Sequence, residues 1–262
     1  MTTFAVITGA SAGLGKEFAK LFAADGHGVV LVARRKDELE ALGRALEASH
    51  GTKAVVMAHD LAERSSARHI YEEVLAQGLD VEFLVNDAGF GSNGAFVELD
   101  IERELHMVDV NVKALMELTY LFLPRMLNRG GGRILNIGSV AGFQPGPFMA
   151  TYYASKAFVN SFSEALAFEL KGTGVSVTLS CPGPTATEFS SSAGNDNSTM
   201  FRAIGGVADP SRVAREAYRA MLAGKSSIVH GLKNQAGVQA LRVSPHSLAI
   251  AIAAKLNRPA RS

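Results

Sequence analysis

Residues 4–15 of the chain read Phe4-Ala5-Val6-Ile7-Thr8-Gly9-Ala10-Ser11-Ala12-Gly13-Leu14-Gly15. The apolar start of this stretch predicts a short buried strand, and the residues from 16 to 24 predict a helix. Glycines between a strand and a helix permit positive φ and leave no Cβ between the backbone and a ligand. The N–H groups and the dipole at the start of the helix favour an anion. We therefore expect this turn to bind a pyrophosphate, although a tight structural turn would also need glycine.

Six further apolar stretches predict strands, and helical stretches separate most of them along the chain. They lie at residues 28–33, 54–57, 81–85, 134–138, 175–179 and 226–230. Strands that alternate with helices predict an α/β fold, here a doubly wound Rossmann-type parallel sheet of about seven strands with helices on both faces. Residues 1–262 show no composition shift or linker, so we expect one domain.

One long helix is expected from about residue 101 to residue 127. Its apolar residues recur at spacings of three and four, which would bury one face. Asn111 lies next to this stripe, where a buried amide must find hydrogen bonds, and by itself it is typical of a structural asparagine. The residues of the stripe are Leu105, Val108, Val112, Leu115 and Leu118.

Composition favours small-molecule partners. The 26 Lys and Arg against 25 Asp and Glu leave a net charge of +1, so no global field points to nucleic acid or an anionic membrane. The single Cys181 excludes an internal disulfide and fits a reducing compartment. The N-terminus has no basic signal region, and the longest late apolar run, 248–254, is far shorter than the roughly 20 residues of a membrane-spanning helix. We expect a cytoplasmic protein, and the seven histidines show no ligand spacing that would indicate a metal.

The second predicted strand ends at Ala33, and Arg34 and Arg35 follow it. In a mononucleotide-binding unit the tip of this strand faces the adenosine ribose, where an acidic residue binds the 2′-hydroxyl. Ala33 offers no carboxylate, and Arg34 would accommodate a 2′-phosphate, so the sequence favours NADP over NAD. Solvated loop arginines are the alternative. Asp60, with Glu63 three residues later, is either a helix N-cap or an adenine contact, and the two are compatible.

Turn-forming residues follow the fourth and sixth predicted strands. Asn86-Asp87-Ala88-Gly89 ends the fourth strand, where a backbone could approach a ligand closely or simply turn. Pro182-Gly183-Pro184-Thr185-Ala186-Thr187 leaves the sixth strand, and a polar tract follows to about residue 199. That tract is either a disordered connector or a lid ordered by a ligand, and we favour a lid at about residues 188–208. The loop at 140–149 carries glycines, prolines and aromatics that could line an apolar pocket.

Tyr152 and Lys156 are four residues apart in a predicted helix, so both side chains leave from one face. A nearby positive charge would favour the phenolate and lower the pKa of the phenol, which is normally about 10. Ser139 lies thirteen residues before Tyr152, at the end of the fifth predicted strand, and could bring a hydroxyl to the same place. Taken alone, Tyr-x-x-x-Lys also arises by chance from a packed tyrosine and a solvated lysine.

Together these residues resemble the short-chain dehydrogenase/reductase family. Thr8-Gly9-x-x-x-Gly13-x-Gly15 is similar to its cofactor turn, Asn86-x-Ala88-Gly89 to its fourth-strand motif, and Pro182-Gly183 with Thr187 to its nicotinamide-side loop. Asp87 departs from the usual Asn-Asn-Ala-Gly. The run from 86 to 189 looks most like the bacterial branch of DltE-type reductases. The catalytic tetrad that the resemblance implies is Asn111, Ser139, Tyr152 and Lys156.

The resemblance implies an NADPH-dependent oxidoreductase, a carbonyl reductase or alcohol dehydrogenase. It would move a hydride between nicotinamide and a small apolar ketone, aldehyde or secondary alcohol. Tyr152 would be the general acid/base and Ser139 would hold the carbonyl oxygen. Lys156 would lower the phenol pKa and bind the nicotinamide ribose, and Asn111 would position a water that feeds protons through Lys156. A non-catalytic NADP(H)-binding regulatory protein is the alternative.

The resemblance also implies a homodimer or homotetramer, because family members commonly pair the helices that carry Asn111 and Tyr152 across subunits. The cofactor would contact the glycine turn, the ends of four strands and the catalytic pair. The residues expected to bind it are Gly9, Ser11, Gly13, Leu14, Gly15, Arg34, Arg35, Asp60, Leu61, Asn86, Ala88, Gly89, Tyr152, Lys156, Pro182, Gly183, Thr185 and Thr187.

Overall fold

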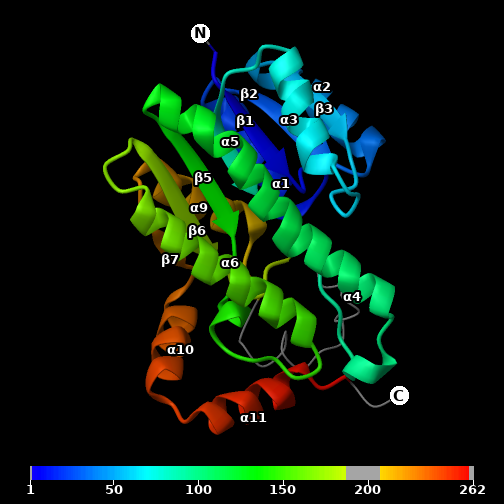
Figure 1. Cartoon of the computed structure of the whole chain (residues 1–262), viewed down its shortest axis with the longest axis vertical. Helices are drawn as coiled ribbons and strands as arrows, with labels where there is room; N and C mark the ends of the chain where they lie inside the picture. The colour runs from blue at the N-terminus through cyan, green and yellow to red at the C-terminus, as the bar shows by residue number, and fades with distance from the viewer. Residues whose placement is uncertain (1, 187–206, 260–262) are drawn as a thin grey trace.

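Seven parallel strands form one sheet in the order β3-β2-β1-β4-β5-β6-β7, which confirms the predicted fold (Figure 1). The computed structural model describes residues 2–186 and 207–259. The order reverses at β1, which pairs with β2 on one side and β4 on the other. In open α/β sheets ligands bind outside the carboxyl ends of the strands at such a point. The strands are β1 (Phe4–Thr8), β2 (Gly28–Ala33), β3 (Ala54–Ala58), β4 (Val81–Asn86), β5 (Gly132–Ile137), β6 (Val175–Cys181) and β7 (Ser227–Val229).

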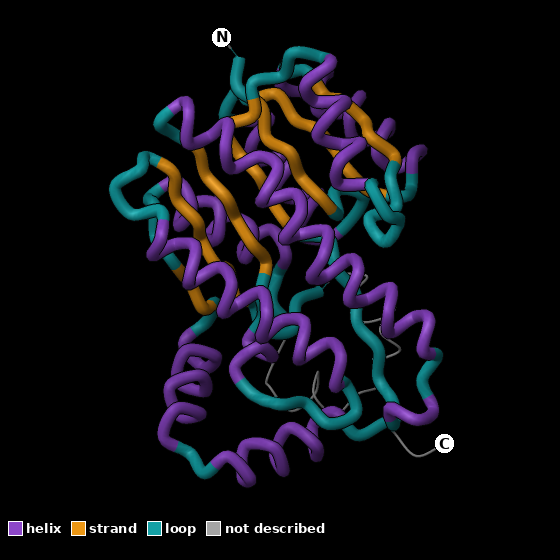
Figure 2. Tube along the Cα trace, in the orientation of Figure 1, coloured by secondary structure: helices purple, strands orange, loops and turns teal. Residues whose placement is uncertain are grey.

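Helices cover both faces of the sheet, as Figure 2 shows. Those described in the structure are α1 (Gly13–Ala24), α2 (Lys36–His50), α3 (Ser66–Ala76), α4 (Ile101–Val108), α5 (Leu115–Arg129), α6 (Ala150–Glu169), α9 (Pro210–Leu222), α10 (Leu232–Val243) and α11 (His246–Asn257). Short helical turns lie at η1 (Phe96–Glu98), η2 (Asp109–Ala114) and η3 (Val140–Phe143). None of the described helices is long and apolar enough to cross a membrane.

Two apolar clusters hold the layers together, because successive side chains of a strand point to opposite faces. Ala5 and Ile7 of β1 pack with side chains of α1, α2 and α9. Phe4 and Val6 pack with side chains of α3 and α5. The apolar strand pattern in the sequence reflects this burial on both faces, which is typical of parallel sheets.

The long helix predicted over 101–127 is interrupted. A π-helical turn, η2, separates α4 from α5, and the three segments follow one another along one axis (Figure 1). Leu115 and Leu118 are buried as predicted, but Leu105 is 51% exposed, so its assignment to the buried stripe is wrong. The wider turn shifts the register of the helix, and the buried residues of α4 are Glu104 and Met107.

Asp60 does not cap a helix. Its carboxylate accepts a hydrogen bond from the N–H of Ala62 (3.0 Å), while α3 begins only at Ser66. The predicted cap is therefore wrong, and Asp60 instead stabilises a local turn at the end of β3. That turn leaves Asp60 beside the cavity described below.

One end of the molecule lies beyond the carboxyl ends of the strands. The arrowheads of β1 and β5 point toward the part of the molecule that holds α4, α10 and α11 (Figure 1). Helix α9 follows Asp209, whose carboxylate accepts hydrogen bonds from the Ser211 and Arg212 N–H groups. Thr187 and nearly all of the predicted lid at 188–208 lie outside the described residues.

Candidate active site

The turn between β1 and α1 has the geometry of an anion cradle. Gly9 (φ +72°) and Gly13 (φ +54°) adopt backbone conformations that other residues rarely take. A Cβ at Gly15 would stand 2.4 Å from the carbonyl oxygen of Gly9, so this glycine is required for close packing. Helix α1 has no acidic side chain in its first turn and no side chain that caps it. Its N-terminus is therefore suited to a phosphate, and the turn fits a dinucleotide.

Two arginines follow the tip of β2, beside the glycine turn. Arg35 donates hydrogen bonds to the Ser11 hydroxyl through Nε (3.3 Å) and Nη2 (3.1 Å). Arg34 Nη1 lies 3.8 Å from a carboxylate oxygen of Asp60. Both arginines line the cavity with Ser11, so two cations and a hydroxyl meet where the adenosine ribose is expected.

A single cavity of about 710 Å³ joins the glycine turn to the predicted catalytic residues. Most of the predicted site residues line it. They are Gly9, Ser11, Gly13, Leu14, Arg34, Arg35, Asp60, Leu61, Ala88, Gly89, Ser139, Tyr152, Lys156, Pro182, Gly183 and Thr185. Gly15, Asn86 and Asn111 do not line it. Asn86 is buried under the cavity floor, where its amide donates to Thr119 (3.2 Å) and Asn136 (2.9 Å).

Ser139 and Tyr152 present two hydroxyls to each other. Ser139 follows β5, and its oxygen accepts a hydrogen bond from the N–H of Ala141 (3.0 Å), which fixes the side chain. Burial raises the pKa of Tyr152 above its ordinary value, and a hydrogen bond with the Ser139 side chain partly offsets this rise. The phenol therefore holds its proton at neutral pH, and the structure gives the opposite direction to the lowered pKa that the sequence predicts.

Lys156 is more than a counterion for Tyr152, because other groups also bind it and influence its pKa. Its ammonium donates to the carbonyl oxygen of Ile137 (2.8 Å) and is buried. Burial lowers the pKa of Lys156 to about 8, and the charge of Asp87 acts against this lowering. Burial raises the pKa of Asp87 to about 7, opposed by Lys156 and by a hydrogen bond from the Gly15 backbone. The charge of Lys156 therefore depends on the nearby carboxylate of Asp87 as well as on burial.

Asn111 lies in the π-helical turn η2 and ties three segments together. Its Oδ1 accepts from the N–H of Phe90 (3.1 Å), and its Nδ2 donates to Phe90 O (3.0 Å) and to Ser155 Oγ (3.1 Å). A Cβ at Gly89 would stand 3.0 Å from Asn111 Oδ1 and 3.6 Å from Lys156 Nζ. A side chain at this position would crowd the Asn111 amide, while the Lys156 amine would lie at ordinary contact distance.

Several cavity residues carry no motif and escaped the sequence analysis. Phe90, Val110 and Tyr153 add apolar side chains to the cavity lining. The charged and polar residues there are Asp100, Glu102, Arg103 and His106. Val140, Ala141 and Met149 of the 140–149 loop line the cavity, whereas its aromatics Phe143 and Phe148, which were expected to do so, do not. The other residues could not be found from the sequence, because no recognisable spacing marks them as facing a cavity.

Cys181 is buried among apolar side chains. Burial raises the pKa of the Cys181 thiol to about 12. In the described ranges, no group of three or more His, Cys, Asp or Glu side chains could hold a metal ion.

The chain belongs to the short-chain dehydrogenase/reductase family, because the family model described as short chain dehydrogenase matches residues 3–198. The very-long-chain 3-oxoacyl-CoA reductase of Pyricularia oryzae is 39% identical over 180 residues, which are 68% of this chain and 54% of that protein. The ketoacyl reductase HetN of Nostoc sp. is 34% identical over 218 residues, 82% of this chain and 74% of that protein. The chain spans about half the length of the curated 3-oxoacyl-CoA reductases that it matches.

Solved structures agree with this assignment. A short-chain dehydrogenase from Sphingobium yanoikuyae in complex with NADPH matches with a TM-score of 0.81 and 31% identity, over 92% of this chain and 93% of that chain. A short chain dehydrogenase/reductase from Burkholderia phymatum in complex with NAD matches with a TM-score of 0.81 and 26% identity, over 92% of each chain. Both solved neighbours therefore share the fold of this chain over most of its length, and their complexes contain NADPH and NAD respectively.

Proposed function

We propose that the protein is an NADPH-dependent carbonyl reductase whose general acid is Tyr152. The observation that carries the proposal is the convergence of Ser139, Tyr152 and Lys156 on one cavity that begins at the glycine turn. A purely regulatory dinucleotide sensor has no need of a hydroxyl pair and a buried amine beside the ligand. The substrate class favoured by the relatives is the 3-oxoacyl thioester, because both a 3-oxoacyl-CoA reductase and a ketoacyl reductase are similar to this chain.

The preference for NADPH rests on the cluster of Ser11, Arg34 and Arg35. Arginine binds a phosphate through charge-assisted and bidentate hydrogen bonds, which a ribose 2′-hydroxyl cannot exploit. Ala33 at the tip of β2 leaves the ribose without the carboxylate that would select NAD. A structural neighbour bound to NADPH supports this choice, although another binds NAD.

Tyr152 and Ser139 would protonate and hold the carbonyl oxygen of the substrate. Bound NADPH would supply a hydride to the carbonyl carbon. The Tyr152 phenol gives its proton to the carbonyl oxygen as the C–O double bond becomes single, so the products are an alcohol and a transient phenolate. Ser139 donates a hydrogen bond to the same oxygen as negative charge develops. The raised pKa of Tyr152 keeps the phenol in its protonated form at neutral pH, which is the form that reduction requires.

Lys156 would restore the proton to Tyr152, and Asn111 would position the helix that carries both residues. The pKa of Lys156 is lowered to about 8, so this amine gives up a proton more readily than an exposed lysine. Its pKa also lies below the raised pKa of the Tyr152 phenol. Asn111 holds the backbone of Phe90 and the Ser155 hydroxyl, and Ser155 in turn donates to the carbonyl oxygen of Tyr152 (2.7 Å). We infer that Asn111 keeps the tyrosine-bearing turn of α6 in register.

We also propose that the chain pairs with a second copy through α5 and α6. Both helices present large apolar side chains to solvent, and a stable soluble surface rarely exposes so many on neighbouring helices. The residues are Met116, Tyr120, Phe158 and Phe168. Sedimentation of the purified chain with Tyr120→Glu would separate this pairing from a monomer.

The function is tested by NADPH consumption with a carbonyl panel. The panel contains 3-oxoacyl-CoA esters of increasing acyl length, aryl ketones, aldehydes and reducing sugars, each with NADPH and with NADH. We expect consumption of NADPH with at least one apolar ketone, and the 3-oxoacyl esters first. Binding of NADPH without consumption by any compound, together with unchanged behaviour of Tyr152→Phe, would favour the regulatory alternative.

A further inference from the structure

The net charge of +1 is the sum of an acidic N-terminal part and a basic C-terminal part of the chain. Residues 217–262 contain seven Lys and Arg and no Asp or Glu. All 25 acidic residues therefore lie in residues 1–216, together with the other 19 basic ones. The C-terminal segment is thus basic on a protein that is otherwise acidic, and a global charge count gives no sign of it.

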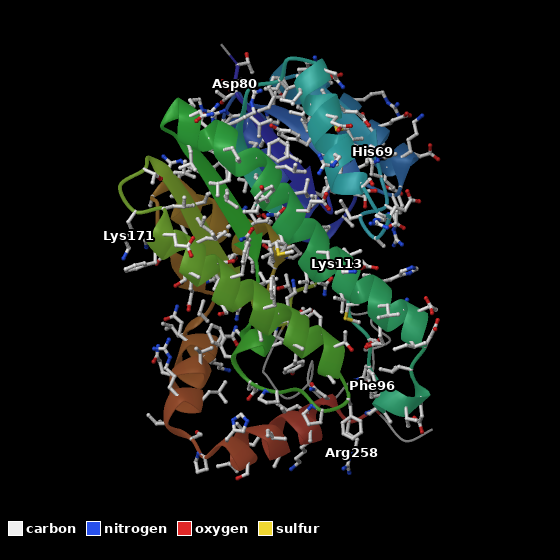
Figure 3. The ribbon with its side chains drawn as sticks, in the orientation of Figure 1. His69, Asp80, Phe96, Lys113, Lys171 and Arg258 are labelled. Atoms are coloured by element: carbon white, nitrogen blue, oxygen red, sulfur yellow. The ribbon has the colours of Figure 1, made fainter. Side chains whose placement is uncertain are left out.

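Helices α10 and α11 carry this basic segment away from the sheet. They form a bent pair at the pole beyond the carboxyl ends of the strands (Figure 1), and Arg258 lies at the same pole in Figure 3. Lys233, Arg242 and Lys255 are exposed, and no ion pair joins any of them to another residue in the described ranges. Their charges are therefore available to an external anionic surface.

Large apolar side chains lie among these charges. In α10 only Val238 is buried, while Leu232 and Val243 at its two ends are 83% and 86% exposed. In α11, Leu248 and Ile252 are four residues apart on one side and are each 51% exposed. Each of the three cations lies within three residues of one of these apolar side chains along its helix.

We propose that the exposed face of α10 and α11, defined by Leu232, Lys233, Arg242, Val243, Leu248, Ile252 and Lys255, docks on an anionic lipid bilayer. Apolar side chains interleaved with Lys and Arg are the pattern of helices that lie in the membrane interface. The cations bind lipid headgroups while the apolar side chains enter the acyl boundary. A second copy of the chain fits less well, because a two-fold contact would set this basic face against itself.

The face is mechanically joined to the catalytic cavity through the last residue of α11. Asn257 is fully buried, and its Oδ1 accepts a hydrogen bond from the hydroxyl of Tyr153 (3.2 Å). Its Nδ2 donates to Pro147 O (3.2 Å), and its own carbonyl oxygen accepts from Asn93 (2.7 Å). Tyr153 lines the cavity beside Tyr152. A docked face would hold the substrate end of the cavity near lipid, where apolar carbonyl compounds concentrate; this last step rests on the proposed function.

Vesicle flotation with the full chain tests the docking without any measurement of turnover. The probes are vesicles of phosphatidylcholine alone and of phosphatidylcholine with phosphatidylglycerol. We expect binding to the second kind only, and release at high salt because the attraction is screened. Lys233→Glu/Arg242→Glu should weaken binding by at least about 25-fold, since each surface cation contributes about fivefold. Leu248→Ser/Ile252→Ser should weaken it as well.

Lys53→Glu/Arg68→Glu is the matched control, because it changes the net charge equally on exposed residues of the opposite part of the chain. This control should keep the wild-type affinity, and all variants should keep their circular dichroism spectra and thermal midpoints. Three outcomes would overturn the proposal: no binding to either vesicle, equal loss in the control, or an oligomer that dissociates in the α10 and α11 variants without any binding to vesicles. A lack of carbonyl turnover would leave the docking result unaffected.

Discussion

The partly buried carboxylate of Asp87 and the buried ammonium of Lys156 carry opposite charges: Lys156 acts to lower the pKa of Asp87, and Asp87 acts to raise the pKa of Lys156. Asp87 also accepts a hydrogen bond from the N–H of Gly15. A Cβ added to Gly15 would stand 2.9 Å from Asp87 Oδ2. The carboxylate therefore connects the glycine turn with the catalytic amine. The position at which the sequence departs from its family's usual asparagine is the one that sets the charge of the lysine.

Asp87→Asn should move the alkaline limb of the pH–rate profile to lower pH. Without the carboxylate, burial lowers the pKa of Lys156 below about 8, so the amine loses its proton earlier as pH rises. If the protonated amine resupplies Tyr152, kcat should fall at a pH lower by about one unit, which corresponds to about 1.4 kcal/mol. The measurement is kcat for carbonyl reduction across the pH range. Asp100→Asn, a cavity-lining carboxylate whose capping role asparagine retains, should leave the profile in place.

Tyr152→Phe should lower kcat by roughly a hundredfold to ten-thousandfold, the usual contribution of a positioned general acid. The affinity for NADPH should stay within about threefold of wild type, because the phenyl ring remains and only a hydroxyl is lost. Steady-state kinetics and cofactor titration measure the two effects.

Tyr153→Phe is the matched control on the neighbouring position. It loses the hydrogen bond to Asn257, which contributes about 1 kcal/mol to stability, and should keep its turnover. Equal losses of turnover in the two variants would show that the register of the catalytic tyrosine is misassigned.

Arg35→Ala should weaken NADPH binding by roughly tenfold to a hundredfold and leave NADH almost unaffected. The guanidinium is positioned by the Ser11 hydroxyl, and hydrogen bonds to charged groups contribute about 1.5 to 3 kcal/mol. Fluorescence titration with both cofactors gives the ratio. Arg44→Ala is the control. It removes an exposed arginine of α2 whose ion-pair partner is Glu40, and it should change the affinity for neither cofactor. A parallel loss for NADH would contradict the assignment to the 2′-phosphate.

The strands and the glycine turn could be predicted because their signals are local. Burial on both faces makes each strand an uninterrupted apolar run, and a cradle that excludes a Cβ, such as the one at Gly15, leaves a glycine in the sequence. Ser139, Tyr152 and Lys156 could be placed together for a similar reason. The spacing of four places Tyr152 and Lys156 on one face of a helix, and Ser139 follows the end of a predicted strand. Both signals can be recognised before any tertiary contact is known.

The failures all involve tertiary context. Leu105 was expected in the buried stripe because an ideal helix continues its register, whereas the π-helical turn around Asn111 changes it. The pKa of Tyr152 was expected to fall because sequence spacing shows a nearby cation but not the burial that opposes ionisation. Asp60 has the spacing of a cap, yet the chain continues for several residues before α3 starts. A basic C-terminal face is visible in the sequence only when charge is counted by segment.

His230→Gln should make the protein less sensitive to acid. His230 is buried between β6 and α9: Nδ1 lies 2.9 Å from a Glu216 oxygen and Nε2 lies 2.9 Å from Ser180 Oγ. Because the carboxylate only accepts, Nδ1 carries the proton and Nε2 accepts from the serine hydroxyl. Burial lowers the pKa of His230, and Glu216 opposes this only in part.

The neutral imidazole therefore contributes stability that is fully present above the unfolded-state pKa of about 6.5 and is lost as pH falls through the lower folded-state pKa. Urea unfolding at about pH 7.5 and about pH 5.5 should show that the free energy of unfolding falls more in the wild type than in the variant. The variant should also be less stable at the higher pH, since an amide replaces both ring contacts imperfectly. His69→Gln, on exposed α3 (Figure 3), should follow the wild type at both pH values. An identical acid loss in His230→Gln would place the pH sensitivity elsewhere, because the buried ring would then bind its proton equally well in the folded and unfolded chains.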